Sequence, residues 1–164
     1  MSAETDITTA AQAANDPRIL AFGRLLGAAN RLEYILGRSL EEESGLSHSL
    51  FELLLVVGRA GGDGITVRDI AQERVLTSGG ATRLVQRGSE RGYIRRRTST
   101  GDRRVQIIEL TPLGEEVLVA ASIRHAENVQ RFLLDVLGAE QADAFADSVR
   151  TLSRNAGRFL PTMP

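Results

Sequence analysis

The chain has 164 residues, of which 42% are hydrophobic, a formal net charge of −1 and no cysteine. This length and composition predict one compact, α-rich domain, and the lack of cysteine excludes disulfides, thiolate metal sites and thiol-based redox sensing. No apolar run approaches the length of a membrane span, and the N-terminus lacks the basic start and apolar core of a signal peptide, so we expect a cytoplasmic location.

The N-terminal part of the chain predicts an arm followed by two helices. Residues 1–16 are small and polar and are expected to form a disordered arm. A long helix is expected from Pro17 to about Glu43, because Asp16 can cap it and apolar residues recur at helical spacing. Ser47 can cap a second helix, which ends at a glycine-rich turn. Its core-like positions are Leu50, Phe51, Leu53, Leu54 and Val57.

Residues 65–93 predict two short helices joined by a tight turn. Thr66 can cap the first helix, the chain turns near Val75, and Thr77 or Ser78 can cap a second helix that ends before Gly92. Four residues of the second helix share one face and are expected to point toward the core: Ala81, Leu84, Val85 and Gly88. Its other face carries small residues and then Thr, Arg and Gln, which can approach DNA and hydrogen-bond base edges. Two helices joined in this way are typical of a helix-turn-helix.

The next stretch, IRRRTSTGDRRVQIIEL over residues 94–110, predicts a β-hairpin. Val105, Ile107 and Ile108 favour a strand, and the polar residues between the two arms break any helix. Five arginines crowd the arms: Arg95, Arg96, Arg97, Arg103 and Arg104. Such a hairpin can grip phosphates and probe a minor groove, or its charges can merely protect a sheet edge. Because it directly follows a helix-turn-helix, we interpret it as the wing of a winged helix.

The charge distribution favours the same interpretation. Residues 66–110 hold 10 arginines against 5 acidic residues, a net charge of +5, whereas the rest of the chain has a net charge of −6. A basic module in an acidic frame is typical of local DNA contact. Every fixed positive side chain is an arginine, which suits phosphate and guanine recognition, although the codon bias of a GC-rich genome also explains the missing lysine.

Two more helices are expected after the hairpin. Thr111 can cap one over residues 112–137, and Gly138 separates it from another over residues 139–158. The predicted fold class is therefore mainly α with a small β-hairpin wing (α+β). The long helices at both ends exceed what one small core needs, so a homodimer is expected, in which two recognition helices meet two DNA half-sites.

No pattern of catalytic residues is present. The chain has no HExxH, GxSxG or phosphate-loop motif, and His48 and His125 belong to no spaced set of ligands. We therefore expect no enzymatic activity, no catalytic residue, no metal and no cofactor.

The chain contains the segments FELLLVVGRAGGDGITVRDIAQ, TSGGATRLVQR, RGYIRR and GDRRVQIIELTPLGEE. Together they resemble the MarR family of bacterial transcriptional regulators, and the best single match is the DRR of the wing followed by hydrophobic residues and LTxxG. The resemblance covers roughly residues 19–158. It implies a winged helix-turn-helix with N- and C-terminal dimerisation helices. The expected organisation is an arm over 1–16, a dimerisation region over 17–46 and 111–160, and a DNA-binding region over 47–110.

The resemblance also implies a set of DNA-binding residues. Asp102 is expected to orient the wing tip and Arg104 to enter the minor groove. The recognition-helix positions are Thr77, Ser78, Gly80, Thr82, Arg83, Gln86 and Arg87, and the wing positions are Arg95, Arg96, Arg97, Asp102, Arg103 and Arg104. The chain departs from the family at Gly88 and Ser89, where a leucine and an acid are usual. Since a glycine costs about 1 kcal/mol in a helix interior, a weakened or bent last turn is expected there.

The predicted function is a repressor that binds a pseudo-palindromic operator and is released by a small phenolic or aromatic ligand. By resemblance, such a ligand lies between the dimer helices and the winged helix. The polar groups expected near that junction are Arg24, Arg31, Tyr34 and His48, each of which can equally be a surface or dimer-interface residue. The alternative is an effector-independent or nucleoid-type winged-helix protein, which would not prefer one site over bulk DNA.

Overall fold

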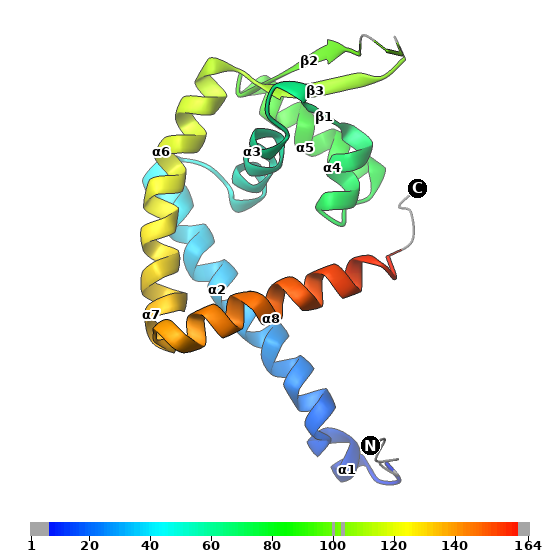
Figure 1. Ribbon diagram of the computed structural model, residues 1–164, viewed down its shortest axis with the longest axis vertical. Helices are drawn as coiled ribbons and strands as arrows, with labels where there is room; N and C mark the ends of the chain where they lie inside the picture. Colours follow the sequence, from blue (N-terminus) through cyan, green and yellow to red (C-terminus); the bar gives the residue numbers. More distant parts are fainter. Residues whose placement is uncertain (1–6, 100, 103, 161–164) are drawn as a thin grey trace. The chain divides into compact units, whose positions relative to one another are not determined.

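The computed structural model describes residues 7–99, 101–102 and 104–160. These residues are mainly helical, with a small three-stranded antiparallel sheet, which confirms the predicted fold class (Figure 1). The chain divides into two compact units, residues 1–35 and residues 36–164. In the described ranges no helix is both long and apolar enough to cross a bilayer.

The first unit contains α1 (Ala10–Asn15) and most of α2 (Pro17–Ser44). Thr9 and Gln12 form a capping box at the start of α1. Asp16 caps α2 as predicted, because its carboxylate accepts the Arg18 backbone N–H at 2.9 Å. The hydrogen-bonded Arg18 guanidinium lowers the pKa of Asp16 to about 2. The expectation of a disordered arm is therefore wrong for residues 10–15, which these caps hold in a helix; residues 1–6 lie outside the described part.

The second unit begins with the end of α2 and continues through three short helices: α3 (His48–Ala60), α4 (Val67–Glu73) and α5 (Ser78–Glu90). Thr66 and Thr77 cap α4 and α5 as predicted, since their hydroxyls accept backbone N–H groups at 3.1 and 3.2 Å. Between the two helices Val75 adopts φ 51°, an uncommon conformation for a β-branched residue, and reverses the chain. The predicted helix-turn-helix is confirmed.

The hydrophobic core of this unit lies where α3, α4 and α5 meet the sheet. The five core positions predicted in α3 and the inward stripe predicted in α5 are all buried. The largest fully buried side chains are Phe51, Leu46, Leu53, Leu54, Ile70, Ile108, Val57 and Val85. Burial of these apolar side chains supplies the main driving force that holds the two helices of the motif at a fixed angle.

The sheet consists of β1 (Ile65–Thr66), β2 (Ile94–Thr98) and β3 (Gln106–Leu110), in the order β1-β3-β2. The strands β2 and β3 form the predicted hairpin, with Arg95 opposite Glu109. Strand β1 was not expected, because two residues are too short to show an alternating pattern. Its pairing with β3 attaches the hairpin to the start of α4.

Gly88 does not break the recognition helix, which stays α-helical through Glu90. A Cβ at this position would lie 2.9 Å from Ile94 Cδ1 and 3.1 Å from Leu53 Cδ2. The glycine therefore allows α5 to pack closely against β2 and α3. The expectation of a weakened last turn is wrong, because tertiary packing outweighs the low intrinsic helix propensity of glycine.

After the hairpin, α6 (Pro112–Val129) continues through a π-helical turn at Gln130–Leu134 into α7 (Asp135–Leu137). Gly138, at φ 74°, ends this run and α8 (Ala139–Gly157) follows. Both predicted C-terminal helices are confirmed, but the π turn was not foreseen. No residue of α8 is buried in the single chain.

A compact joint connects the base of the hairpin with the start of α6. The Thr111 hydroxyl donates to the Gly92 carbonyl at 2.6 Å and accepts the Gly114 N–H at 3.0 Å. The Thr111 N–H donates to the Tyr93 carbonyl at 3.0 Å. A Cβ at Gly114 would overlap that same Tyr93 carbonyl. The LTxxG motif, residues 110–114, therefore has a structural role: it packs the start of α6 against the backbone between α5 and β2.

We predict that Gly114→Ala destabilises the fold by about 1–3 kcal/mol, because the added methyl group must displace backbone atoms rather than a flexible side chain. Chemical denaturation measures this change. The matched control is Gly79→Ala, where nothing lies within 4 Å of the added Cβ. In that exposed helical position alanine is expected to stabilise the protein by up to about 1 kcal/mol. Equal stabilities of the two variants would contradict the close approach at Gly114.

Candidate nucleic-acid interface

The helix α5 presents a polar face opposite its buried stripe. Thr82, Arg83, Gln86 and Arg87 are exposed on this face. The Thr82 hydroxyl donates a hydrogen bond to the Ser78 carbonyl one turn earlier in the helix, at 2.9 Å. Within the described part of the chain, neither Arg83 nor Arg87 forms an ion pair with a carboxylate. Both guanidinium groups are therefore available to an external anion or a base edge.

Both the nitrogen and the oxygen of the Gln86 side-chain amide form hydrogen bonds. Its Nε2 donates to Glu90 Oε1 at 3.0 Å, and its Oε1 accepts from Arg96 Nη2 at 3.5 Å. Arg96 is the wing arginine that lies on the α5 side of the hairpin, since strand residues alternate between faces. This chain of contacts joins the recognition helix to the wing. Gln86 must exchange these partners before it can bind a base edge.

At the tip of the wing, Asp102 orients Arg104. The Asp102 carboxylate accepts the Arg104 backbone N–H at 2.9 Å and two guanidinium N–H groups at 3.2 and 3.1 Å. These bonds hold the pKa of Asp102 below its usual range. The Arg104 side chain is nevertheless 91% exposed. A fixed and solvated guanidinium at the end of a hairpin is suited to insertion into a narrow groove.

The other wing arginines are divided between structural and exposed positions. Arg95 and Arg97 share the face of Glu109 and pair with it, and this bonding, led by Arg97, lowers the pKa of Glu109. Arg97 also donates to the Asp63 carbonyl at 2.9 Å, which ties the wing to the turn after α3. These two arginines therefore contribute to wing structure. Arg103, also expected to bind DNA, lies outside the described residues.

The four residues expected near an effector fall in different units. Arg24, Arg31 and Tyr34 are exposed on α2 in the first unit, whereas His48 begins α3 in the second. Their assembly into one site stays a prediction. A cavity of about 410 Å³ within the second unit, beside α5, is lined by none of the four.

Sequence reasoning missed a half-buried polar cluster around His48. Its Nε2 lies 3.5 Å from Glu52 Oε1, and Glu52 also pairs with Arg74, the residue before the turn of the helix-turn-helix. The pKa of Glu52 is lowered by its hydrogen bond with His48. The ring of His125, from α6, lies 4.9 Å from that of Phe51 and 6.4 Å from that of His48. Nothing in the local sequence indicates that these distant residues meet.

A helix-turn-helix with an uncompensated cationic face, followed by an arginine-tipped hairpin, defines a winged-helix DNA-binding regulator. The comparisons with known proteins agree. A model of the MarR family matches residues 44–105. The chain is 26% identical over 121 residues to the uncharacterized HTH-type transcriptional regulator YdgJ of Bacillus subtilis (strain 168), covering 74% of this chain and 72% of that protein.

Solved structures give the same result. The fold is similar to that of Sco3205, a MarR family transcriptional regulator from Streptomyces coelicolor in complex with DNA, with a TM-score of 0.74, 26% identity and coverage of 83% of this chain and 85% of that one. It is also similar to CouR from Rhodococcus jostii RHA1 bound to p-coumaroyl-CoA, with a TM-score of 0.71, 19% identity and coverage of 89% and 95%. Residues 44–105 therefore match the MarR family of transcriptional regulators, and the fold of the chain is that of solved regulators of this family.

The His125 environment predicts a pH-dependent stability. Its Nδ1 is buried without a hydrogen-bond partner, and burial lowers its pKa from the usual 6.5. Protonation therefore favours the unfolded state, so stability should fall as the pH drops below 6.5 and continue to fall until His125 is charged in the folded state. Glu52 lies outside this window because its pKa is lowered from 4.5.

Denaturation of the wild type and of His125→Phe between about pH 8 and about pH 5.5 tests this expectation. The variant should lose less stability on acidification than the wild type, since its ring cannot titrate. Parallel pH profiles for the two proteins would show that His125 is already charged, or is not buried, in the folded state.

Proposed function

We propose that the protein is a repressor that binds a pseudo-palindromic operator as a homodimer and is released by a small phenolic or aromatic ligand. The DNA-binding part of this proposal is supported by one observation: some arginines pair with carboxylates of the protein, whereas those on α5 and at the wing tip stay exposed to solvent. Arg83 and Arg87 on α5 have no carboxylate partner in the described residues, and Arg104 is held at the wing tip yet exposed. These side chains face solvent where a duplex would supply phosphates and base edges.

The homodimer is supported by apolar surface that the single chain leaves uncovered. In α2, Phe22 is 61% exposed, and in α8, Leu152 is 57% exposed. Other exposed apolar residues of the two ends are Ile19, Leu25, Leu26, Val149, Phe159 and Leu160. Soluble proteins rarely leave such apolar stripes in contact with water. A second copy of the chain would cover them and would place two recognition helices on two half-sites.

Repression and release by a ligand are the finer parts of the proposal. A dimer on an operator that overlaps a promoter blocks access to it. The fold similarity to CouR, solved with p-coumaroyl-CoA, supports an aromatic ligand for this chain, and Arg24, Arg31, Tyr34 and His48 remain the residues proposed to hold it. The alternative is a nucleoid-type protein. Competition with bulk DNA at several salt concentrations separates the two, since an operator binder prefers its site by orders of magnitude.

Loss of the wing arginine should weaken binding. Arg104→Ala is expected to cost about 1–3 kcal/mol in operator affinity, because a minor-groove guanidinium is removed. Asp102→Ala should reproduce part of this loss, since Arg104 then lacks its orienting carboxylate. Fluorescence anisotropy with an operator recovered from genomic fragments measures both. The control Arg150→Ala removes an exposed arginine that is paired with Asp147 on α8 and should bind as the wild type does. An unchanged affinity for Arg104→Ala would refute the wing assignment.

The recognition helix should determine the preferred bases. Arg83→Ala and Gln86→Ala are each expected to alter the consensus, since both side chains can make bidentate contacts with base edges worth about 1–3 kcal/mol. Selection of binding sites from a random DNA pool gives the consensus for each variant. Arg87 lies nearer the flank of the recognition helix, where we propose that it holds a DNA phosphate, so Arg87→Ala should lower affinity but leave the consensus unchanged. If Arg83→Ala and Gln86→Ala select the wild-type consensus, these residues do not read bases.

The terminal helices should hold two copies together. Deletion of residues 139–164 is expected to lower both solubility and operator affinity, because without α8 the proposed dimer does not form, its apolar surface stays in contact with water and the half-sites are no longer linked. Sedimentation velocity reports the oligomeric state of the full chain and of the truncated one. A full-length monomer at micromolar concentration that still binds its operator tightly would overturn the homodimer.

A further inference from the structure

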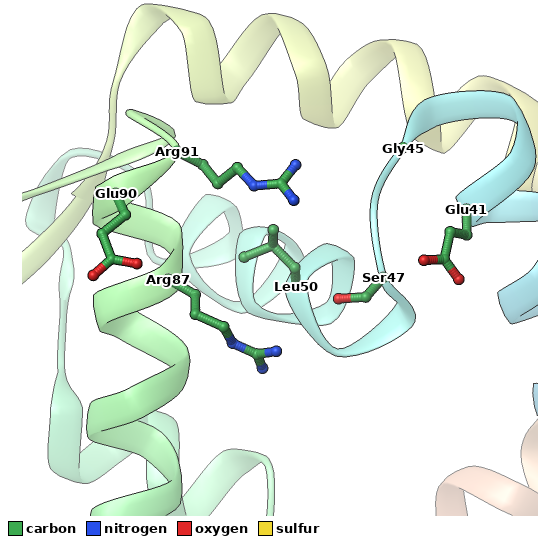
Figure 2. Close-up of a pocket in the computed structure, with 7 residues that line it drawn as sticks. All are labelled: Glu41, Gly45, Ser47, Leu50, Arg87, Glu90 and Arg91. Carbon is green, nitrogen blue, oxygen red and sulfur yellow. The ribbon is translucent and has the colours of Figure 1, made fainter.

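The cavity beside α5 combines the apolar side chain of Leu50 with two arginines, Arg87 and Arg91, that form no ion pair with a carboxylate in the described part of the chain. It has a volume of about 410 Å³ and lies between the C-terminal half of α5, the end of α2 and the start of α3. Figure 2 shows the guanidinium groups of Arg87 and Arg91 both reaching from α5 toward the loop that carries Ser47, with Leu50 between them. The volume falls in the range that holds a small metabolite.

The two arginines are arranged for one shared anion. Residues four apart in a helix lie about 5–6 Å from each other on the same face, so Arg87 and Arg91 can both reach a single anionic group. Among the residues that the structure describes, no carboxylate forms an ion pair with either of them. Glu90 also lines the cavity, but it accepts a hydrogen bond from Gln86 at 3.0 Å and its carboxylate points to the opposite side of α5.

The side of the cavity opposite α5 supplies a hydrogen-bond donor, the Ser47 hydroxyl, and an acceptor, the Glu41 carboxylate. Ser47 is the N-cap residue of α3, yet its hydroxyl caps no backbone N–H and lies 3.4 Å from Ser49 Oγ. It can therefore donate to an anion, next to the positive end of the α3 dipole. Glu41 lies on the far side of the cavity and turns its carboxylate toward Ser47. A ligand that spans the cavity needs an anionic end at the arginines and a hydroxyl donor at Glu41.

We propose that this cavity binds a phosphate monoester of a small hydroxylated metabolite. Two guanidinium groups and a hydroxyl match the charge and the three acceptor oxygens of a phosphate better than they match a carboxylate. The carbon skeleton lies against Leu50, and a hydroxyl group donates to Glu41. Binding occupies Arg87, the residue proposed to hold a DNA phosphate, so the ligand competes with DNA. This competition rests on the proposed function, whereas the binding itself does not.

The test titrates the full-length protein, without DNA, with glucose 6-phosphate, inorganic phosphate, glucose and benzoate by calorimetry. Glucose 6-phosphate should bind most tightly, inorganic phosphate more weakly, and glucose not at all. Arg91→Ala should lower the affinity for glucose 6-phosphate about tenfold or more, because a charge-assisted hydrogen bond to the phosphate is lost. Arg150→Ala, which removes an exposed arginine of α8 that does not line the cavity, should bind as the wild type does. Thermal melts confirm that both variants fold.

Three results would overturn the site: no phosphate compound binds at millimolar concentration, Arg91→Ala binds as the wild type does, or benzoate binds more tightly than glucose 6-phosphate. The competition has its own readout. Glucose 6-phosphate should release the wild type from DNA but leave Arg91→Ala bound. Release of both alike, or of neither, would refute competition. If the protein binds glucose 6-phosphate but no DNA, the proposed function fails and the site stands.

Discussion

The position of the wing relative to the recognition helix depends on one backbone contact. The N-terminus of α6 approaches the Tyr93 carbonyl so closely that only glycine fits at position 114. Thr111 secures the same joint through Gly92 and Tyr93. Since α5 ends and β2 begins here, and β3 returns here, both ends of the wing are anchored at one place. The exposed tip can then carry Arg104 while its base stays rigid.

A second close contact fixes the helix itself. Gly88 allows α5 to approach Ile94 in the wing and Leu53 in α3 without a side chain between them. The Gln86 amide continues this connection on the polar face through Arg96. The recognition helix and the wing therefore behave as one body. In the proposed complex, major-groove and minor-groove contacts are made in a fixed register rather than independently.

The arginines show how one residue type serves two purposes. Arg95 and Arg97 neutralise Glu109, and Arg97 also binds the backbone at Asp63. The two ion pairs offset part of the positive charge on one face of the hairpin, and the Arg97–Asp63 hydrogen bond fastens the hairpin to the turn after α3. Arg83, Arg87 and Arg91 have no such partners in the described residues and keep α5 strongly cationic. A count of arginines in the sequence cannot separate these two groups, because the separation depends on which strand positions share a face with Glu109.

The sequence by itself determined the elements of the second unit and the character of the interface. Capping residues such as Thr66, Thr77 and Thr111 and the apolar periodicity of α3 and α5 are local signals, and they predicted the helices almost to the residue. The Asp102–Arg104 pair was expected by resemblance and forms within three residues. Tertiary structure alone decided the role of Gly88, the addition of β1, the meeting of His48 with His125 and the cavity at Arg87 and Arg91. Each of these requires side chains distant in sequence to be brought together, and burial and packing, which local propensity does not contain, determine that arrangement.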